Sequence, residues 1–318
     1  MGSVPWLILA LGMSIFYLPL ALVSRWGITA YPLIYLIMEE VRNQFPFGGF
    51  GWVRIAYTQA DSPYSKIAAI AGASSLSAFV LILGLILFFG LRRKFDVITV
   101  LPFVLLFVPV TLSTTATANV MMIQGNVPSM GLDFNSRAKA VFYNHFERTQ
   151  QELAKNPDVD LILWPENSVD VDPFLNSDVK ASLDTIEHPL IIGAILNKGN
   201  KLLNTSILWG GELPDTYIKQ HLTPFGEYIP LRSLARIVSP LVDDVDDFSP
   251  GDTSKTFSID TIKVSPVICY ELIDDDLLYQ ASKNANLLAV QTNSATFGMS
   301  AESAQQLSIT RIRAIEHG

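Results

Sequence analysis

The first third of the chain carries long runs of apolar residues. No charged side chain occurs from Met1 to Ser24, and the 25 residues from Ile67 to Leu91 are also uncharged. An α-helix of about 20 apolar residues spans the hydrocarbon core of a bilayer. We therefore predict a transmembrane helical region over residues 1–116, with spans near residues 4–24, 26–41, 67–91 and 97–114. A signal peptide is the alternative for the first run, but no basic residues precede it and further apolar segments follow.

After Thr117 the pattern changes to short apolar runs separated by polar segments with helical spacing. Short apolar strands that alternate with helices are typical of a layered α/β fold with a largely buried sheet. We predict such a domain over residues 117–318. The expected strands are 120–124, 161–164, 190–196, 206–209, 216–221, 262–269 and 287–291, and the expected helices are 134–155, 179–187, 274–283 and 301–317.

The basic loop Arg92-Arg93-Lys94 sets the expected orientation. Positively charged residues in short loops are retained on the cytoplasmic side of a membrane. A span over 97–114 would then deliver the α/β domain to the opposite face. We therefore expect a multi-pass protein of the cytoplasmic (inner) cell membrane, with the α/β domain on the extracytoplasmic face.

A segment rich in glycine and aromatic residues, Phe47–Trp52, lies in the expected outer connection between the second and third spans. Aromatic side chains of this kind lie well at the boundary between lipid and water. We interpret the segment either as a lipid-entry site or as an interfacial helix break that binds no ligand.

Composition agrees with a chain that works at a membrane. Of the 318 residues, 49% are apolar and 16% are charged, and the mean hydropathy is +0.33. These values exclude a disordered chain and argue against a wholly cytosolic one. Residues 121–318 hold 15 basic against 26 acidic side chains, which argues against a nucleic-acid partner. The acidic run 243–247 fits no calcium-binding loop, so we interpret it as a solvated surface.

The sequence predicts no metal and no cofactor. The single cysteine, Cys269, excludes an internal disulfide and any multi-cysteine metal site. The four histidines are scattered and form no HExxH motif and no cluster with cysteine. His221 lies on the same side of a predicted strand as Lys219. It is expected either to line a site there or to make a structural hydrogen bond.

Three ionisable residues, Glu166, Lys219 and Cys269, stand at or beside the ends of separate predicted strands. Open α/β sheets usually carry their functional groups at such ends. A cysteine thiol needs a nearby base or cation to act as a nucleophile at neutral pH, and glutamate and lysine supply one of each. Spacing alone leaves a simpler interpretation open, in which the cysteine is a buried structural residue and the lysine points to water.

The residues around these three positions resemble a known family. Leu-Trp-Pro-Glu-Asn at 163–167, Tyr-Ile-Lys-Gln-His-Leu-Thr-Pro-Phe-Gly-Glu-Tyr-Ile-Pro at 217–230 and Val-Ile-Cys-Tyr-Glu at 267–271 are similar to the signature blocks of the nitrilase, or carbon–nitrogen hydrolase, superfamily. They resemble in particular its membrane-bound branch, the apolipoprotein N-acyltransferases. The resemblance extends to 40–42, 48–52, 124–128, 291–293, 297–298 and 311–316, and so covers nearly the whole chain.

The resemblance implies a nitrilase-like αββα sandwich, preceded by the transmembrane helices. It implies that Cys269 is the nucleophile, that Glu166 is the general base and later the acid, and that Lys219 stabilises the oxyanion. The residues that it implies in support of this triad are Glu227, Tyr270 and Glu271. The residues that it suggests for substrate binding are Phe50, Trp52, Asn293 and Phe297.

The reaction that the resemblance implies is transfer of a fatty acyl chain from a membrane phospholipid to the N-terminal amino group of a diacylated lipoprotein, through a cysteine thioester. The expected partners are therefore the phospholipid donor, the diacylated lipoprotein acceptor and the bilayer, with no nucleic acid. An alternative is a membrane-tethered amidase or nitrilase-type hydrolase that uses the same triad with water. A further alternative is a non-catalytic membrane scaffold.

The sequence departs from the family pattern in three places. Residues 129–134 hold no counterpart of a family tryptophan, and Ser294 stands where many members carry aspartate. The resemblance also places the last sheet strands and a final transmembrane helix beyond Gly318. We therefore expect the sandwich to be incomplete at its carboxyl end.

Overall fold

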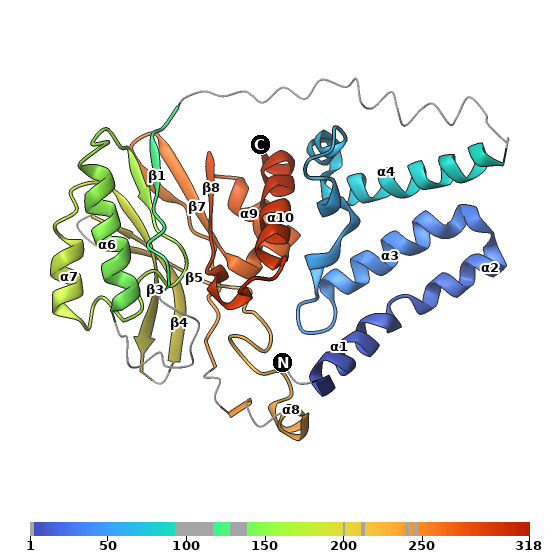
Figure 1. Ribbon diagram of the computed structural model, residues 1–318, viewed down its shortest axis with the longest axis horizontal. Coiled ribbons are helices and arrows are strands. Elements are labelled where there is room, and N and C mark those ends of the chain that lie inside the picture. Colours follow the sequence, from blue (N-terminus) through green and yellow to red (C-terminus); the bar gives the residue numbers. More distant parts are fainter. Residues whose placement is uncertain are drawn as a thin grey trace. The chain divides into compact units, whose positions relative to one another are not determined.

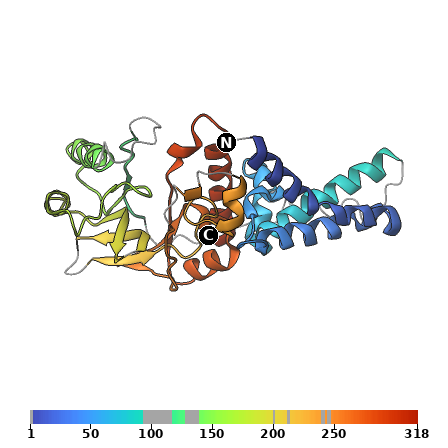
Figure 2. The same ribbon diagram turned by 90° about the horizontal axis from the view of Figure 1, so that it is seen from below.

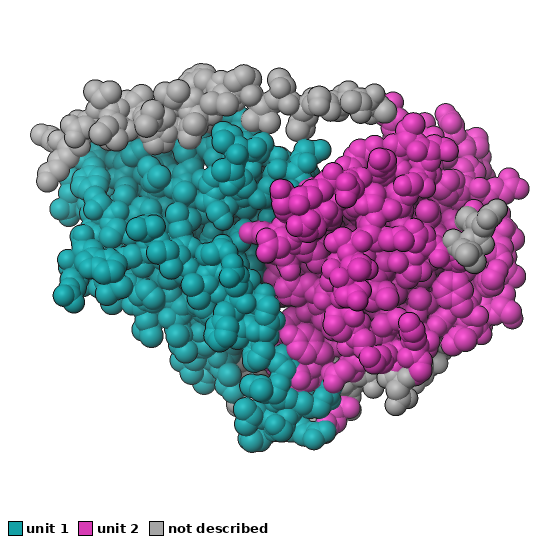
Figure 3. All heavy atoms as spheres, turned by 180° about the vertical axis from the view of Figure 1, so that it is seen from behind, with its two compact units in different colours: residues 1–113, 230–242, 304–318 teal, residues 114–229, 243–303 magenta. Residues whose placement is uncertain are grey.

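Two units make up the chain, and Figure 3 colours them separately. Unit 1 comprises residues 1–113, 230–242 and 304–318, and unit 2 comprises residues 114–229 and 243–303. The structure is a computed structural model. It describes residues 3–92, 117–127, 139–199, 201–210, 214–238, 242–243 and 247–318.

Unit 1 contains the apolar helices of the amino-terminal region. Two stretches, Leu7–Trp26 and Ser65–Leu91, are long and apolar enough to cross a membrane. The large apolar side chains of Leu11 and Ile82 are exposed, as expected for helices that face lipid rather than water. The expected span over 97–114 lies outside the described residues. The helices here are α1 (Ser3–Ile15), η1 (Leu18–Leu22), α2 (Val23–Trp26), η2 (Ile28–Ala30), α3 (Tyr31–Gln44) and α4 (Ala68–Leu91).

Helix α4 is broken near its start. Ala71 and Gly72 have non-helical backbone angles, with φ of +75° at Gly72. The N–H group of Ala73, which begins the second part of the helix, donates to the carboxylate of Glu316 at 2.9 Å. A Cβ atom at position 72 would lie 2.4 Å from that carboxylate. Glycine is therefore required here both for its positive φ and for the close approach of Glu316.

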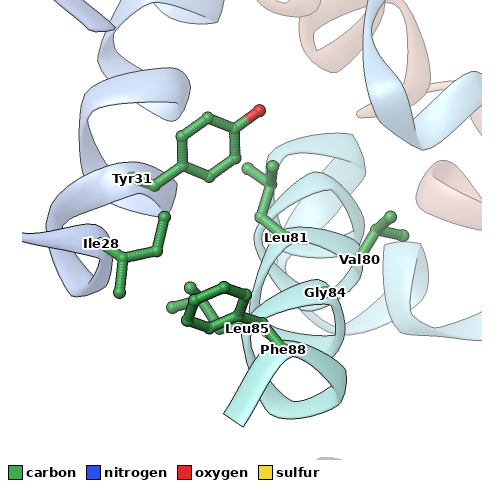
Figure 4. Close-up of a pocket in the computed structure, with 7 residues that line it drawn as sticks. All are labelled: Ile28, Tyr31, Val80, Leu81, Gly84, Leu85 and Phe88. Atoms are coloured by element: carbon green, nitrogen blue, oxygen red, sulfur yellow. The ribbon is translucent and has the colours of Figure 1, made fainter. Parts of the chain in front are cut away.

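An apolar cavity of about 260 Å³ lies between α4 and the junction of η2 with α3 (Figure 4). Ile28 and Tyr31 form one wall. Side chains of α4 form the other wall, on the part of the helix that follows its break. These α4 residues are Val80, Leu81, Gly84, Leu85 and Phe88.

The last helix, α10 (Glu302–His317), belongs to unit 1 from Ala304 onward. Trp52 donates its indole N–H to Gln305 at 2.8 Å. The guanidinium of Arg313 lies 5.7 Å from the ring centre of Tyr57. The segment between α3 and α4, with η3 (Gly51–Val53), η4 (Ile55–Gln59) and η5 (Ser65–Ile67), is therefore held by the carboxyl-terminal helix.

Unit 2 is built on two sheets (Figure 1). The larger sheet has the order β1-β2-β3-β4-β5, parallel from β1 to β3 and antiparallel from β3 to β5. Its strands are β1 (Val120–Met122), β2 (Leu161–Leu163), β3 (Leu190–Lys198), β4 (Lys201–Trp209) and β5 (Asp215–Ile218). The smaller sheet has the order β6-β7-β8, with strands β6 (Phe257–Ile259), β7 (Ile262–Ile268) and β8 (Leu287–Gln291).

Apolar residues on both faces of the larger sheet build two cores. On one face, Ile162 and Leu190 pack with Phe142 and Val179 of helices α6 (Ala140–Leu153) and α7 (Ser177–Leu183), which cover this face together in Figures 1 and 2. On the other face, Leu161 and its neighbours pack against the smaller sheet in a second core. Helix α9 (Asp275–Ser282) packs against β7 and β8. The predicted αββα order is confirmed.

The strand predictions differ from the structure mainly at their ends. Strand β4 starts at Lys201 rather than at 206, and β6 is an additional strand. Helix α8 (Arg232–Val238) belongs to unit 1. The expected helix over 134–155 is described from Ala140 onward.

Candidate active site

Glu166, Lys219 and Cys269 come together at the ends of three strands. Glu166 follows β2, Lys219 follows β5, and Cys269 follows β7 directly. The ammonium of Lys219 lies 3.5 Å from a carboxylate oxygen of Glu166. The thiol of Cys269 forms a hydrogen bond with Glu166. Residues that are 53 and 50 positions apart in sequence therefore share one site in unit 2.

Cys269 sits at a sharp change of backbone direction. It has a φ of +51° and opens the 3₁₀ helix η10 (Cys269–Ile273). Thr292 donates its hydroxyl to the sulfur at 3.5 Å. Burial and the charge of Glu166 raise the pKa of the thiol to about 12, although Lys219 acts in the opposite direction. The resting thiol is therefore protonated at neutral pH, and it needs a base at the moment of attack.

Glu166 is held by donors on two sides. The backbone N–H of Asn293 donates to one carboxylate oxygen at 3.0 Å, and the side chain of Asn204 donates to the other at 2.8 Å. Gly193 of β3 makes room for it, because a Cβ atom there would lie 2.7 Å from the Cα atom of Glu166. These contacts leave the carboxylate buried but oriented toward Lys219 and Cys269.

Lys219 is the buried cation of the site. Its ammonium lies 2.7 Å from a carboxylate oxygen of Glu227 and 3.4 Å from the hydroxyl of Thr223. Burial opposes its charged form, but the negative charges of Glu166 and Glu227 prevail and raise the pKa of Lys219 above its ordinary value. Lys219 is therefore a permanent positive charge over the working range of pH.

Glu227 is the second carboxylate of the site. The backbone N–H of Thr223 donates to it at 2.7 Å, and Asn204 donates to it at 2.6 Å. Burial raises the pKa of this carboxyl, but Lys219 and these hydrogen bonds outweigh burial, so the pKa lies below its ordinary value. Glu227 therefore remains ionised beside the ammonium.

Glu271 ties the end of β5 to the end of β7. Its carboxylate accepts hydrogen bonds from the hydroxyl of Tyr217 and from the backbone N–H groups of Gln220 and Ile268, each at 2.7 Å. Burial raises its pKa, although these donors and Lys219 act in the opposite direction. The segments that carry Lys219 and Cys269 are fixed to each other through this one side chain.

Tyr270 is buried beside the nucleophile, and the ring of His221 packs edge-on against it at a centroid distance of 5.5 Å. The Nδ1 atom of His221 lies 2.8 Å from Asp274. Asp274 also accepts the N–H of Leu277 at 3.0 Å and so caps α9. Of the two roles that the sequence left open for His221, the structure shows a hydrogen-bonded one.

The expected substrate-binding residues fall into two groups. Asn293 and Phe297 belong to unit 2, where Asn293 donates its backbone N–H to Glu166 and Phe297 is half-buried in η11 (Ser294–Phe297). Phe50 and Trp52 belong to unit 1. Among the residues that the structure describes, no group of three or more His, Cys, Asp or Glu side chains could hold a metal ion.

Asn204 is a site residue that the sequence analysis missed. It lies on β4 within Leu-Leu-Asn-Thr-Ser-Ile-Leu, where three polar residues interrupt an apolar strand. All three of these residues are buried. Polar residues at such positions need partners, and this requirement is a signal that could have placed Asn204 in the site.

Comparisons with known proteins match the amino-terminal and carboxyl-terminal parts of the chain to two different family models. Residues 122–318 match the family model of the carbon–nitrogen hydrolases, and residues 1–86 match the model of the apolipoprotein N-acyltransferase N-terminal domain. Over 219 residues the chain is 35% identical to the apolipoprotein N-acyltransferase of Mycolicibacterium smegmatis, covering 62% of this chain and 36% of that protein. Over 317 residues it is 28% identical to the Vibrio parahaemolyticus protein of the same name, covering 92% of this chain and 62% of that protein.

The chain thus spans less than two thirds of the length of these two relatives. A crystal structure of a carbon–nitrogen hydrolase from Helicobacter pylori is similar to the present chain, with a TM-score of 0.45 and 14% sequence identity. That similarity covers 62% of this chain and 68% of the other.

Proposed function

Because this chain belongs to the carbon–nitrogen hydrolase family, we propose that Glu166, Lys219 and Cys269 carry out acyl transfer through a cysteine thioester. The single observation that carries the proposal is the shared position of a thiol, a carboxylate and an ammonium in a buried site. A buried thiol with a raised pKa is inert by itself, but it becomes a nucleophile when a neighbouring carboxylate accepts its proton.

The first half of the proposed reaction forms the thioester. Glu166 takes the thiol proton while the sulfur of Cys269 attacks the carbonyl carbon of a phospholipid acyl ester. The negative charge moves to the carbonyl oxygen, where the ammonium of Lys219 stabilises it. The tetrahedral intermediate then collapses, the ester C–O bond breaks, and Glu166 returns the proton to the leaving alcohol of the lysophospholipid.

The second half transfers the acyl chain to an amine. The N-terminal amino group of a diacylated lipoprotein attacks the thioester carbonyl, and the carbon–sulfur bond breaks. Glu166 accepts a proton from the attacking nitrogen and passes it to the departing sulfur, which restores the thiol. The products are an amide on the lipoprotein and free enzyme, so no cofactor is consumed.

A lipid donor is supported by the amino-terminal part of the chain. Residues 1–86 match the N-terminal domain of apolipoprotein N-acyltransferases, and the described residues include two apolar stretches long enough to cross a membrane. We place the protein in the cytoplasmic membrane as a multi-pass protein. The basic residues Arg92-Arg93-Lys94 support a cytoplasmic position for their loop and an extracytoplasmic position for the catalytic unit.

The remaining residues receive supporting roles in this proposal. Glu227 holds Lys219 in place, and Glu271 and Tyr270 fix the turn that carries the nucleophile. Phe50 and Trp52 would contact lipid at the membrane surface, and Asn293 and Phe297 would line the approach to Cys269. Exclusion of water from that approach would favour transfer over hydrolysis of the thioester.

An assay with two substrates tests the proposed function. The full chain is incubated in vesicles that contain a phospholipid with a labelled acyl chain, together with a synthetic diacylated lipopeptide that has a free amino terminus. The expected product is an N-acylated lipopeptide, and Cys269→Ser should abolish it, because a hydroxyl ionises far less readily than a thiol. Release of labelled fatty acid alone would instead assign the chain to the hydrolases.

A further inference from the structure

Asn204 connects the two carboxylates of the site. Its side-chain amide nitrogen donates to Glu166 at 2.8 Å and to Glu227 at 2.6 Å. Its backbone carbonyl also accepts the N–H of Lys219 at 2.9 Å. One residue of β4 therefore forms hydrogen bonds with the base, with the second carboxylate and with the backbone of Lys219. Asn204 is almost completely buried, with 2% of its surface exposed.

The charges in the site explain why such a donor is needed. Glu166 and Glu227 are two carboxylates that share one ammonium, that of Lys219, in a buried space. Two like charges in one buried space oppose each other, and each hydrogen-bond donor favours the charged form of the carboxylate that it serves. The two N–H bonds of a single amide nitrogen can serve one carboxylate each, and this is the arrangement that the structure shows.

We infer that Asn204 is a positioning residue that keeps both carboxylates ionised and separates their tasks. Glu227 stays with Lys219, while Glu166 remains available to accept the proton of Cys269. This inference deepens the proposed function, because it assigns the residue that prepares the base of that same site. A residue that only filled space in the sheet would not need to donate to both acids.

The ionisable groups that face Asn204 all belong to the described site. They are Glu166 after β2, Lys219 after β5, Glu227 in the following loop and Cys269 after β7, with Glu271 beside Lys219. Protonation of Glu166 is the step that would remove the base. On the acid side of the pH profile, the rate at which Cys269 is alkylated falls as pH decreases, and we call this fall the acid limb. The position of the acid limb therefore reports on what Asn204 does.

The chain offers a probe for this limb that does not depend on acyl substrates. Cys269 is the only cysteine, so alkylation of the full chain by iodoacetamide reports on this one thiol. The rate is measured against pH for the wild type, for Asn204→Asp and for Asn204→Leu, both of which keep nearly the same size. Thr205→Val is the matched control. Thr205 is the next residue along the strand, and its hydroxyl donates to the carbonyl of Ala194 at 2.7 Å and not to either carboxylate.

We expect the acid limb to move to higher pH by about one to two pH units in both Asn204 variants, the effect of losing a hydrogen bond to a charged group. The limb should stay in place in Thr205→Val. An equal loss of rate at every pH without movement of the limb would overturn the inference. Failure of both variants to fold, judged by circular dichroism, would also overturn it, because Asn204 would then serve the fold rather than the base.

The same samples separate this inference from the proposed function. If the limb moves as expected but no N-acylated lipopeptide forms in the wild type, the role of Asn204 stands and acyl transfer to an amine fails. If transfer occurs and the limb does not move, the proposed function stands and the role of Asn204 fails.

Discussion

The ammonium of Lys219 lies 2.7 Å from a carboxylate oxygen of Glu227, and both side chains are buried. Burial opposes the charged form of both groups, but the pairing lowers the pKa of Glu227, and the charges of Glu166 and Glu227 together raise the pKa of Lys219. Removing one member of a buried ion pair leaves an uncompensated charge, which is more costly than losing a pair at the surface. Loss of either Lys219 or Glu227 should therefore lower the stability of unit 2 as well as disturb the candidate active site.

Lys219→Met should lower the free energy of unfolding at pH 7 by about 3–5 kcal/mol, because Glu227 and Glu166 lose their cation. Lys255→Met is the matched control, since Lys255 pairs with Asp215 at 2.6 Å and both side chains are about 40% exposed. The control should lose no more than about 1 kcal/mol. Urea denaturation in detergent micelles measures both values. Equal losses in the two variants would show that the buried pair stabilises the fold no more than the exposed pair.

The same pair predicts the pH dependence of stability. A lowered pKa means that Glu227 stabilises the folded state above its unfolded pKa of about 4.5, and that this contribution is lost as pH falls through the folded pKa. A raised pKa means that Lys219 contributes fully below its unfolded pKa of about 10.5 and loses this contribution as pH rises through the folded pKa. In Glu227→Gln, the decline of stability on the acid side should be shallower than in the wild type.

Glu166→Gln should remove the base that accepts the proton of the Cys269 thiol. The variant lacks the base that takes the thiol proton, but it also lacks the charge of Glu166 that raises the pKa of the thiol. The alkylation rate of Cys269 should therefore follow the ionisation of the thiol itself and increase with pH. The rate of acyl transfer should fall by about 10²- to 10⁴-fold, the usual contribution of a general base. Alkylation and transfer rates that match the wild type would remove Glu166 from the mechanism.

Gly193 is predicted to be essential for the position of Glu166. A Cβ atom there would lie 2.4 Å from the carbonyl oxygen of Pro165 and 2.7 Å from the Cα atom of Glu166. Gly193→Ala should therefore displace the base and reduce kcat, with a loss of about 1–3 kcal/mol of stability from overpacking. Gly84→Ala is the control, because nothing lies within 4 Å of a Cβ atom at that position. A kcat for Gly193→Ala that equals the control would contradict the steric argument.

Trp52 is predicted to contribute through its ring rather than through its hydrogen bond. Trp52→Ala should slow acyl transfer while leaving the circular dichroism spectrum unchanged. Gln305→Ala removes the acceptor of the indole N–H at 2.8 Å but keeps the ring, and it should leave the transfer rate close to that of the wild type. If both variants keep full activity, the segment 47–52 takes no part in the mechanism.

Much of unit 2 follows from local patterns in the sequence. The apolar runs that become β3, β7 and β8 are long enough to be recognised, and each contributes to a core. Strand β6 was missed because its three residues include the polar Ser258 and therefore form no apolar run, unlike the equally short β1 and β2. The first part of β4 was missed because Asn204 and Thr205 are polar, and a pattern of hydrophobicity alone does not show that these two residues are buried with hydrogen-bond partners.

Contacts between distant parts of the chain were the features that sequence did not predict. The run 67–91 reads as one uninterrupted helix, but the structure breaks α4 at Ala71 and Gly72, where Glu316 receives the N–H of Ala73. The acceptor lies 243 residues away. Short motifs in the sequence predicted the three triad positions. The bridge through Asn204 depends on which strands are neighbours, so it was visible only in three dimensions.

Mass analysis of Cys269 after incubation with phospholipid tests the central proposal most directly. The account predicts that the peptide carrying Cys269 gains the mass of one acyl chain. Neutral hydroxylamine should remove this mass, as expected for a thioester, and addition of the diacylated lipopeptide should transfer it to the peptide amine. A Cys269 peptide that stays unmodified under conditions in which the wild-type chain turns over, or an acyl group found on another residue, would contradict the account.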